Sequence, residues 1–361
     1  MAPVVRCLAQ TPGIVSRVCV TAQHREMLDQ VLQLFQIEPN YDLNLMREDQ
    51  GLAELSAAIF TQLDPVLADF QPDWVLVQGD TTTVAIAALL SYYHRIRVGH
   101  VEAGLRTHDK WQPFPEEINR RVAGVTADLH FAPTQWTRNN LLREGIDDRL
   151  IVVTGNPVID ALQYVAQQPE PALVRQLVER LGIRSEASSD GQRLIVVTAH
   201  RRESFGKPLE SICDGLRQLA GRGDVEIVYP VHLNPHVQEP VKRLLGGVPH
   251  VTLMPPMDYL PLVHLMKCAE LILTDSGGIQ EEAPTFGKPV LVLREVTERP
   301  EGVEAGTVKV VGADAQRIVS EASCLLDDPS AYARMARAAN PYGDGHAAPR
   351  IVQALLDHPI S

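Results

Sequence analysis

Short runs of Val, Ile and Leu alternate with helical stretches along the whole chain. Several runs are almost continuously apolar, as expected for parallel strands that are covered on both faces. Helical stretches such as Thr82–His94 and Lys207–Gly221 lie between them. This alternation predicts strand–helix–strand units and parallel sheets. The predicted strands are Arg17–Thr21, Trp74–Gln78, Arg97–Val101, Leu129–Ala132, Leu150–Thr154, Leu194–Thr198, Glu226–Pro230, His250–Met254, Leu271–Thr274, Pro289–Leu293 and Val308–Val311.

A polar stretch interrupts the alternation near the middle of the chain. Residues 166–193 contain Gln-Gln-Pro-Glu-Pro and Ser-Glu-Ala-Ser-Ser-Asp-Gly around a short predicted helix at Ala172–Leu181. Polar residues with Pro and Gly at mid-chain are typical of a domain boundary. A chain of 361 residues is also long enough for two domains. We therefore expect two doubly wound α/β domains, residues 1–166 and 194–340, joined by a linker at 167–193.

Charge and composition narrow the possible functions. The formal net charge is −12, from 33 Lys and Arg against 45 Asp and Glu, which argues against non-specific binding to nucleic acid or an anionic membrane. A local group of Arg and backbone N–H groups can still hold an anionic small ligand. No apolar run reaches the length of a membrane span, and the N-terminus lacks a signal-peptide pattern. The five cysteines form no C-x-x-C, so we expect buried free thiols in a cytoplasmic protein.

Polar residues follow five of the predicted strands. Ligands of open α/β sheets bind beyond the carboxyl ends of the strands. Polar strings at five such ends in two domains indicate a cleft between facing sheets, with acids from the first domain and phosphate binders from the second. The five strings are Gln78–Thr81, Glu102–Arg106, Ala199–Glu203, Val231–His232 and Asp275–Gly278.

The Ser276-Gly277-Gly278 string precedes a predicted helix. Small residues let a phosphate approach the first N–H groups of a helix, and the helix dipole favours its charge. A tight turn between strand and helix is the alternative explanation. Glu281 and Glu282 follow, and one of these carboxylates can accept both hydroxyls of a ribose. Compensation of the helix dipole is the alternative for them.

Carboxylates gather in the first domain at Asp80, Glu102, Glu116 and Glu117. Acids at neighbouring strand ends repel one another unless they chelate a metal, bind a cation or share protons. No His or Cys spacing supports zinc, so proton transfer is the favoured interpretation and we expect no metal. The alternative is ion pairing with nearby arginines, namely Arg106, Arg120 or Arg121.

Histidines also stand at strand ends. His200 is followed by Arg201 and Arg202 and can donate a proton or a hydrogen bond to a phosphate or a leaving oxygen. Capping of a helix is the alternative role for His200. His100 and His232 are weaker candidates for the same chemistry.

Together these motifs resemble one known family, the bacterial non-hydrolysing UDP-N-acetylglucosamine 2-epimerases. Each string alone is weak, but the strings run in order over nearly the whole chain. The matching strings are Gln23–Leu28, Gly79–Thr83, Gly99–Thr107, Pro115–Glu117, Ala199–Glu203, Tyr229–Pro235, Thr274–Pro284, Thr297–Glu301 and Asn340–Gly345.

The resemblance implies a two-domain glycosyltransferase-B fold in which a C-terminal helix within residues 341–361 returns to the first domain. It implies interconversion of UDP-GlcNAc and UDP-ManNAc by elimination of UDP to 2-acetamidoglucal and re-addition. No NAD, metal or other cofactor is implied. A homodimer and a supply of ManNAc for cell-surface polysaccharide synthesis are further expectations from the family.

The resemblance also implies roles for the candidate residues. Asp80 and Glu102 would be the acid/base groups at C2, and Glu116 and His200 would assist C–O cleavage and the departure of UDP. The implied UDP-binding residues are Ser276, Gly277, Gly278, Glu282 and Arg202.

A second UDP-GlcNAc site activates some bacterial members, and Gln23, His232 and Arg202 lie in strings near it. Glu26 and Asp49 are acidic where activator-dependent members can carry Gln and Arg. Negative charge near a diphosphate is unfavourable, so we expect no strong activation of this kind.

The start of the chain departs from the family pattern. Family members begin with a buried strand and a Gly-Thr-Arg-Pro-Glu loop, whereas residues 1–6 here match the second half of the following helix. We therefore expect an N-terminally shortened chain, and greater stability and activity in a chain extended by roughly 15 residues, because loss of a central strand exposes sheet edges. The alternative functions are a retaining glycosyltransferase or hydrolysing epimerase on the same fold, and an inactive UDP-sugar-binding protein.

Overall fold

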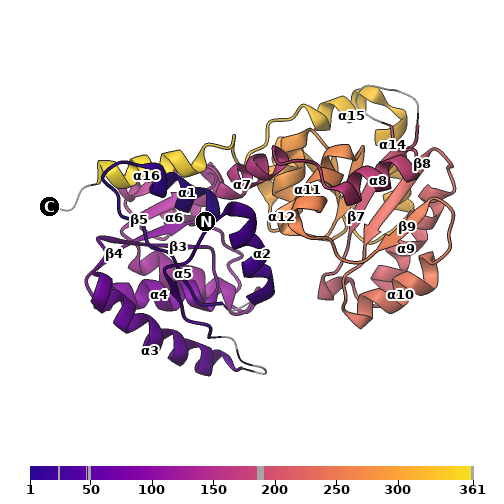
Figure 1. Cartoon of the computed structure of the whole chain (residues 1–361). Coiled ribbons are helices and arrows are strands. Elements are labelled where there is room, and N and C mark those ends of the chain that lie inside the picture. The colour runs from indigo at the N-terminus through magenta and orange to yellow at the C-terminus, as the bar shows by residue number, and fades with distance from the viewer. Residues whose placement is uncertain (23–24, 46, 48–49, 185–190, 359–361) are drawn as a thin grey trace. The chain divides into compact units, whose positions relative to one another are not determined.

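The computed structural model describes residues 1–22, 25–45, 47, 50–184 and 191–358, and the chain divides into two compact units (Figure 1). Unit 1 comprises Met1–Ala161 and Tyr342–Ser361, and unit 2 comprises Leu162–Pro341. The first boundary falls inside helix α7 (Pro157–Ala166). Both units are built on parallel sheets, as the alternation of strands and helices predicted.

Unit 1 contains a four-stranded parallel sheet with the strand order β3-β4-β5-β6. Its strands are β3 (Trp74–Gln78), β4 (Arg97–Val101), β5 (Leu129–Ala132) and β6 (Ile151–Val153). A separate parallel pair is formed by β1 (Cys19–Val20) and β2 (Tyr41–Asp42). The helices are α1 (Ala2–Gln10), α2 (Arg25–Phe35), α3 (Leu52–Phe70), α4 (Thr82–Tyr93), α5 (Glu116–Thr126), α6 (Gln135–Arg143) and α16 (Ala347–Asp357), with a short 3-10 turn at Asp148–Leu150.

Helices cover both faces of the four-stranded sheet because its side chains alternate in direction. On one face, Val77 and Val98 pack with the apolar sides of α3 and α4. On the other face, Val101 and Phe131 pack with α1 and the C-terminal helix α16. The predicted return of the C-terminal helix to the first domain is therefore confirmed, and Figure 1 shows α16 beside α1.

A buried carboxylate anchors the start of α16. Asp160 accepts the backbone N–H groups of Ala347 and Ala348 at 3.1 and 2.8 Å, which satisfies donors that a helix N-terminus leaves unpaired. Burial raises the pKa of Asp160, while these two hydrogen bonds act in the opposite direction. The contact ties the two distant chain segments of unit 1 together.

Unit 2 contains a six-stranded parallel sheet with the order β12-β11-β10-β7-β8-β9. This is a doubly wound order. Successive strands are added on one side of β7 as far as β9 and on the other side from β10 onward, and such sheets bind ligands at this reversal point between β7 and β10. The strands are β7 (Arg193–Thr198), β8 (Val225–Pro230), β9 (Val251–Met254), β10 (Leu271–Thr274), β11 (Val290–Val292) and β12 (Val308–Val310). The helices are α8 (Ala172–Arg180), α9 (Lys207–Ala220), α10 (Pro235–Leu245), α11 (Tyr259–Cys268), α12 (Gly277–Glu282), α13 (Pro300–Ala305), α14 (Ala315–Asp327) and α15 (Pro329–Ala336), with 3-10 turns at Arg202–Ser204 and Ala283–Phe286.

The core of unit 2 lies between its sheet and the helices α9, α10 and α14. Ile195, Ile227 and Leu273 belong to the buried apolar cluster on this face, together with Leu216 of α9. The near-continuous Val, Ile and Leu of these strands reflect burial on both faces, and all six predicted strands are present with small shifts of their ends.

The predictions for the first strand and for the cysteines are confirmed only in part. The strand predicted at Arg17–Thr21 is reduced to Cys19–Val20, and the short strand Tyr41–Asp42 was not predicted because two residues carry no readable alternation. All five cysteines are free, as expected. The expectation that they are buried is wrong outside Cys213, and Cys324 is exposed because it lies on the solvent side of α14.

The described residues contain neither a membrane-spanning helix nor a cluster of metal-ligating side chains. No helix among them is both long and apolar enough to cross a membrane. No group of three or more His, Cys, Asp or Glu side chains in the described part of the chain is arranged to hold a metal ion.

Candidate active site

Two of the predicted acids in unit 1 meet at the ends of neighbouring strands. Asp80 follows β3 after Gly79, and Glu102 directly follows β4, which pairs with β3. The Gln78 Nε2 group donates to Oε2 of Glu102 at 3.3 Å, and Gly79 N donates to the carbonyl of Val101 at 3.0 Å. The structure thus places the turn that carries Asp80 against the Glu102 carboxylate.

The backbone around Glu102 is unusual. Glu102 has φ +64°, a left-handed conformation that costs a non-glycine residue roughly 1–2 kcal/mol. Gly79 also has a positive φ, and a Cβ atom added there would lie 3.7 Å from Oε2 of Glu102. Strained residues cluster at functional sites, so this geometry marks Glu102 as a site residue in a way that the sequence does not reveal.

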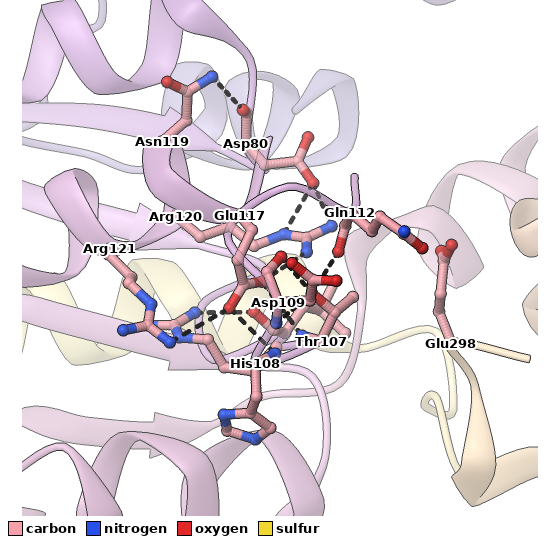
Figure 2. A network of polar contacts seen from close by, with 12 residues as sticks. Asp80, Thr107, His108, Asp109, Gln112, Glu117, Asn119, Arg120, Arg121 and Glu298 are labelled. Carbon is pink, nitrogen blue, oxygen red and sulfur yellow. Dashed lines mark hydrogen bonds and ion pairs between the residues drawn. The ribbon is translucent and has the colours of Figure 1, made fainter. Parts of the chain in front are cut away.

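Asp80 is held by an arginine from α5 (Figure 2). Arg120 donates to Oδ2 of Asp80 from Nε at 3.0 Å and from Nη2 at 2.7 Å. The Asn119 side chain donates to the carbonyl of Asp80 at 2.9 Å. The alternative of ion pairing is therefore realised at Asp80, although the pair also leaves an oriented, partly exposed carboxylate. The two hydrogen bonds from Arg120 fix the orientation of the Asp80 carboxylate, as a group that transfers a proton requires.

Glu116 and Glu117 are adjacent in the sequence but differ in environment. Glu117 is fully buried and pairs with Arg120 and Arg121. Glu116 begins α5, and its Oε2 is buried without a hydrogen-bond partner among the described residues. A buried carboxylate oxygen without a partner is costly, which makes Glu116 the better candidate for contact with a ligand.

His100 contacts the turn that carries Asp80. It is fully buried on β4, and its Nε2 lies 2.8 Å from the carbonyl of Gly79, to which the neutral ring donates. Burial lowers the pKa of His100 to about 4, so the ring stays neutral at physiological pH. This places His100 in a supporting role for the Asp80 turn. Arg106 pairs with Glu144 instead of a candidate acid.

In unit 2, the candidate residues collect at the reversal point of the sheet. His200 follows β7 and Ser276 follows β10, the two strands between which the strand order reverses. The hydroxyls of Thr198 and Thr274 at the ends of these strands lie 2.6 Å apart. Ser276 N donates to the Thr274 hydroxyl at 2.9 Å. The carboxyl ends of the strands thus bring the two predicted strings together.

Asp275 orients His200. Its carboxylate is fully buried, and Oδ2 accepts the backbone N–H groups of His200 and Arg201 at 2.7 Å each. Oδ1 lies 3.4 Å from Nδ1 of His200. Burial lowers the pKa of His200, Asp275 acts in the opposite direction, and Arg201 and His232 lower it further. The arrangement leaves the Nε2 side of the ring for a ligand.

His232 lies against His200. Their rings stack with centroids 5.4 Å apart and an interplanar angle of 11°. Arg202 begins the 3-10 turn after His200 and is exposed. Gln23, which was assigned with His232 and Arg202 to a second ligand site, lies outside the described residues.

The glycine-rich turn leads into α12, which begins at Gly277. A Cβ atom added to Gly277 would lie 3.8 Å from Nη2 of Arg299, so this guanidinium borders the turn. Arg299 also pairs with the buried Glu281. Of the two adjacent acids, Glu282 instead accepts a hydrogen bond from the Tyr259 hydroxyl at 2.7 Å. The two glutamates thus have different partners, and sequence analysis singled out neither partner, since Arg299 occurs there only within the string Thr297–Glu301 and Tyr259 does not occur.

The buried Glu282 carboxyl predicts a pH-dependent stability. Burial raises its pKa from 4.5 to about 7, Tyr259 opposes the shift, and Glu281 adds to it. A raised pKa means that the stabilising contribution of neutral Glu282 is present below about pH 4.5 and is lost as the pH rises through 7. In chemical denaturation, wild type should therefore lose up to roughly 3 kcal/mol relative to Glu282→Gln between pH 4.5 and 8.

The exposed Glu210 offers a matched control for this measurement, because it forms a surface pair with Arg243. Glu210→Gln should show the same pH dependence as wild type. Equal pH dependence in wild type and Glu282→Gln would contradict the assignment of Glu282 as a buried carboxyl of raised pKa.

Fold and site together define a class of protein. One unit has a doubly wound sheet with an oriented histidine and a glycine-rich turn at its reversal point, which is where such sheets bind nucleotides. The other unit presents carboxylates, one with a fixed arginine, at adjacent strand ends. These are the parts of an enzyme that performs acid/base chemistry on a nucleotide-linked substrate.

Comparison with known proteins agrees with this class. A sequence model of the UDP-N-acetylglucosamine 2-epimerase family matches residues 6–356. The UDP-N-acetylglucosamine 2-epimerase of Yersinia pestis is 54% identical over 364 residues, covering 100% of this chain and 96% of the relative. The protein of that name from Escherichia coli K12 is 55% identical over 362 residues, with the same coverage. The chain therefore belongs to the UDP-N-acetylglucosamine 2-epimerase family.

Solved structures of relatives share the fold. The crystal structure of the Neisseria meningitidis UDP-GlcNAc 2-epimerase bound to UDP-GlcNAc matches with a TM-score of 0.90 and 48% identity, covering 99% of this chain and 96% of that one. The Methanocaldococcus jannaschii enzyme in complex with UDP-GlcNAc and UDP matches with a TM-score of 0.78 and 32% identity, with the same coverage. These matches confirm the expected glycosyltransferase-B fold. The expected N-terminal shortening finds no support, because the chain covers 96% of the Yersinia and Escherichia relatives.

Proposed function

We propose that this chain interconverts UDP-GlcNAc and UDP-ManNAc by eliminating UDP to a 2-acetamidoglucal and adding it back. The observation that carries this proposal is the placement of Asp80, held by Arg120, beside the strained Glu102 at adjacent strand ends. Membership of the family and the nucleotide sugars in the structures of relatives support it.

Unit 1 supplies the proton transfers. The C2 proton next to an acetamido group is weakly acidic, so its removal needs an oriented base shielded from water. As the C2–H bond breaks, its electron pair forms the C1–C2 double bond, and the C1–O bond breaks with its pair leaving on UDP. Addition reverses these steps with a proton delivered to the opposite face of C2. Two carboxylates, Asp80 and Glu102, suit two faces better than one.

Unit 2 holds and stabilises the departing UDP. His200, oriented by Asp275, donates to the leaving oxygen or phosphate, and the turn Ser276-Gly277-Gly278 offers backbone N–H groups to the diphosphate. Glu282 accepts the ribose hydroxyls, and Arg202 adds positive charge. Glu116 assists C–O cleavage through its buried Oε2, which has no hydrogen-bond partner among the described residues.

A second UDP-GlcNAc site that involves His232 stays part of the proposal, while Gln23 lies outside the described residues. His232 stacks on His200, so a ligand that binds to His232 would lie next to the group that assists UDP departure. Glu26 and Asp49 are acidic in the sequence where activator-dependent members can carry Gln and Arg, so the dependence of rate on UDP-GlcNAc should be hyperbolic. Steeply sigmoidal kinetics would contradict this expectation.

We also propose a homodimer. Helix α5 exposes Ile118 and Val125, which are 42% and 85% exposed and lie on one side of the helix because seven residues span two turns. An exposed apolar stripe on a helix is typical of a surface that another subunit covers. Light scattering should give twice the chain mass for wild type and a lower mass for Val125→Asp.

Product analysis tests the proposed reaction. Incubation of the purified chain with UDP-GlcNAc, followed by proton NMR, should show UDP-ManNAc accumulating to an equilibrium mixture without free sugar. Release of free ManNAc and UDP would favour a hydrolysing epimerase. Turnover only with an added acceptor would favour a glycosyltransferase, and UDP binding without turnover would favour an inactive sugar-nucleotide-binding protein.

A further inference from the structure

Glu117 is the adjacent acid to which the mechanism above gives no role, although it is fully buried. Its Oε2 accepts the backbone N–H of Thr107 at 3.1 Å and Nη1 of Arg120 at 3.2 Å. Its Oε1 accepts the backbone N–H of His108 at 3.3 Å and lies 3.5 Å from Nη2 of Arg121. Both oxygens are therefore engaged, which leaves a substrate little access to them.

The contacts of Glu117 converge on the loop between β4 and α5. Thr107 and His108 belong to this loop, which also carries an internal hydrogen bond from the Thr107 hydroxyl to the carbonyl of Gln112 at 2.5 Å (Figure 2). Glu117 thereby fixes the middle of the loop to the first turn of α5. The loop follows Glu102 in the sequence and leads to Glu116, so its position affects both candidate acids.

One guanidinium joins Glu117 to Asp80. Arg120 uses Nη1 for Glu117 and uses Nε and Nη2 for Asp80. The side chain of Arg120 is 8% exposed, so these contacts are shielded from solvent and the planar fork has a single orientation. Arg121 also pairs with Glu117, but its side chain is 45% exposed and it has no contact with Asp80 among those the described residues show.

We propose that Glu117 is a positioning residue for the proton transfer at C2, and that it acts on Asp80 through Arg120. This inference rests on the proposed function. Glu117 holds the guanidinium in the orientation that presents two N–H groups to Asp80, and it shares the positive charge of Arg120 with Asp80. The substrate contacts stay with Asp80, Glu102 and Glu116.

Glu117 and Arg120 carry opposite charges and therefore have opposite effects on the protonation of Asp80. The groups that face it are Arg120 from α5, Glu102 at the end of β4 and the neutral His100 beneath the turn, with Glu117 behind Arg120. Without the Glu117 charge, Arg120 acts on Asp80 alone and favours its ionised form more strongly. Without the Arg120 charge, protonation of Asp80 becomes easier.

Steady-state kinetics over a range of pH test this inference. Glu117→Gln should lower kcat roughly 10–100-fold with little change in KM for UDP-GlcNAc, because an oriented base is disturbed while binding is not. The acidic limb of its pH–kcat profile should move to lower pH, whereas the limb of Arg120→Met should move to higher pH. Glu117→Asp, which keeps the charge, should recover part of the rate.

Arg121→Met is the matched control, since it removes the other arginine that pairs with Glu117 and should leave kcat and the pH profile as in wild type. Glu117→Gln/Arg120→Met should be no slower than Arg120→Met, because the two changes interrupt the same chain of contacts. An unchanged kcat in a folded Glu117→Gln, or shifts of both limbs in the same direction, would overturn the inference while leaving the epimerase activity of wild type intact. Absence of epimerisation in wild type would overturn the proposed function instead.

Discussion

Replacing Asp80 by Asn is expected to lower kcat by roughly 10²–10⁴-fold, the usual contribution of a positioned general acid or base. Asn has the size of Asp and its carbonyl can still accept from Arg120, so the loss measures the missing proton acceptor more than a change of packing. UDP binding by calorimetry should be nearly unchanged, because the proposed nucleotide contacts lie in unit 2. Glu102→Gln should have a loss of similar size if both acids serve C2.

A second ion pair in unit 1 provides the control. Arg138 donates to Oδ1 of Asp148 from Nε at 3.0 Å and from Nη2 at 2.6 Å, which reproduces the Arg120–Asp80 geometry at an exposed position. Asp148→Asn removes the same interaction away from the strand ends and should leave kcat unchanged. Activity of Asp80→Asn within a few-fold of the Asp148→Asn control would remove Asp80 from the proposed mechanism.

Gly104→Ala is expected to give the largest loss of stability among single substitutions near the site. Gly104 has φ +90°, and an added Cβ atom would lie 2.3 Å from the carbonyl oxygen of Thr137 and 3.1 Å from Cγ of Leu141. Both contacts come from α6, whose Asn140 side chain also donates to the carbonyl of Gly104 at 2.9 Å. Helix α6 would have to move, at a cost of at least about 3 kcal/mol including the backbone strain. The melting temperature should fall by roughly 10 °C.

Gly145→Ala is a control that introduces the same backbone strain as Gly104→Ala without a steric clash. It has φ +86°, almost the same as Gly104, but an added Cβ atom would have no neighbour within 4 Å among the described residues. Gly145→Ala should therefore cost only the strain of about 1–2 kcal/mol. Equal melting temperatures for the two variants would contradict the close contact between α6 and the Glu102 loop.

The sequence predicted most of the fold because buried parallel strands have a readable composition. Trp74–Gln78 and Leu271–Thr274 occur at the predicted bounds, since their Val, Ile and Leu are bracketed by turn residues. The short pair of Cys19–Val20 and Tyr41–Asp42 was misjudged because its pairing depends on tertiary contacts and not on a local pattern.

Part of the site was predictable and part was not. Asp80 and Ser276 could be found because strand ends of a parallel sheet share one edge, so position along the chain translates into position in space. The clamp of Arg120 on Asp80 depends on how α5 packs, and the positive φ of Glu102 depends on the turn beside it. Asp275 stands in the sequence only as part of the string Asp275–Gly278, and its contact with His200 depends on the adjacency of β7 and β10.

The central claim is that the C2–H bond and the C1–O bond both break during epimerisation. The measurement that tests it most directly is incubation of the purified chain in D2O with UDP-GlcNAc labelled with ¹⁸O in the bridge between C1 and the β-phosphate. The account predicts UDP-ManNAc with deuterium at C2 and with the label spread to the non-bridging oxygens of the β-phosphate. UDP-ManNAc that keeps its C2 proton, or keeps all label in the bridge, would contradict it.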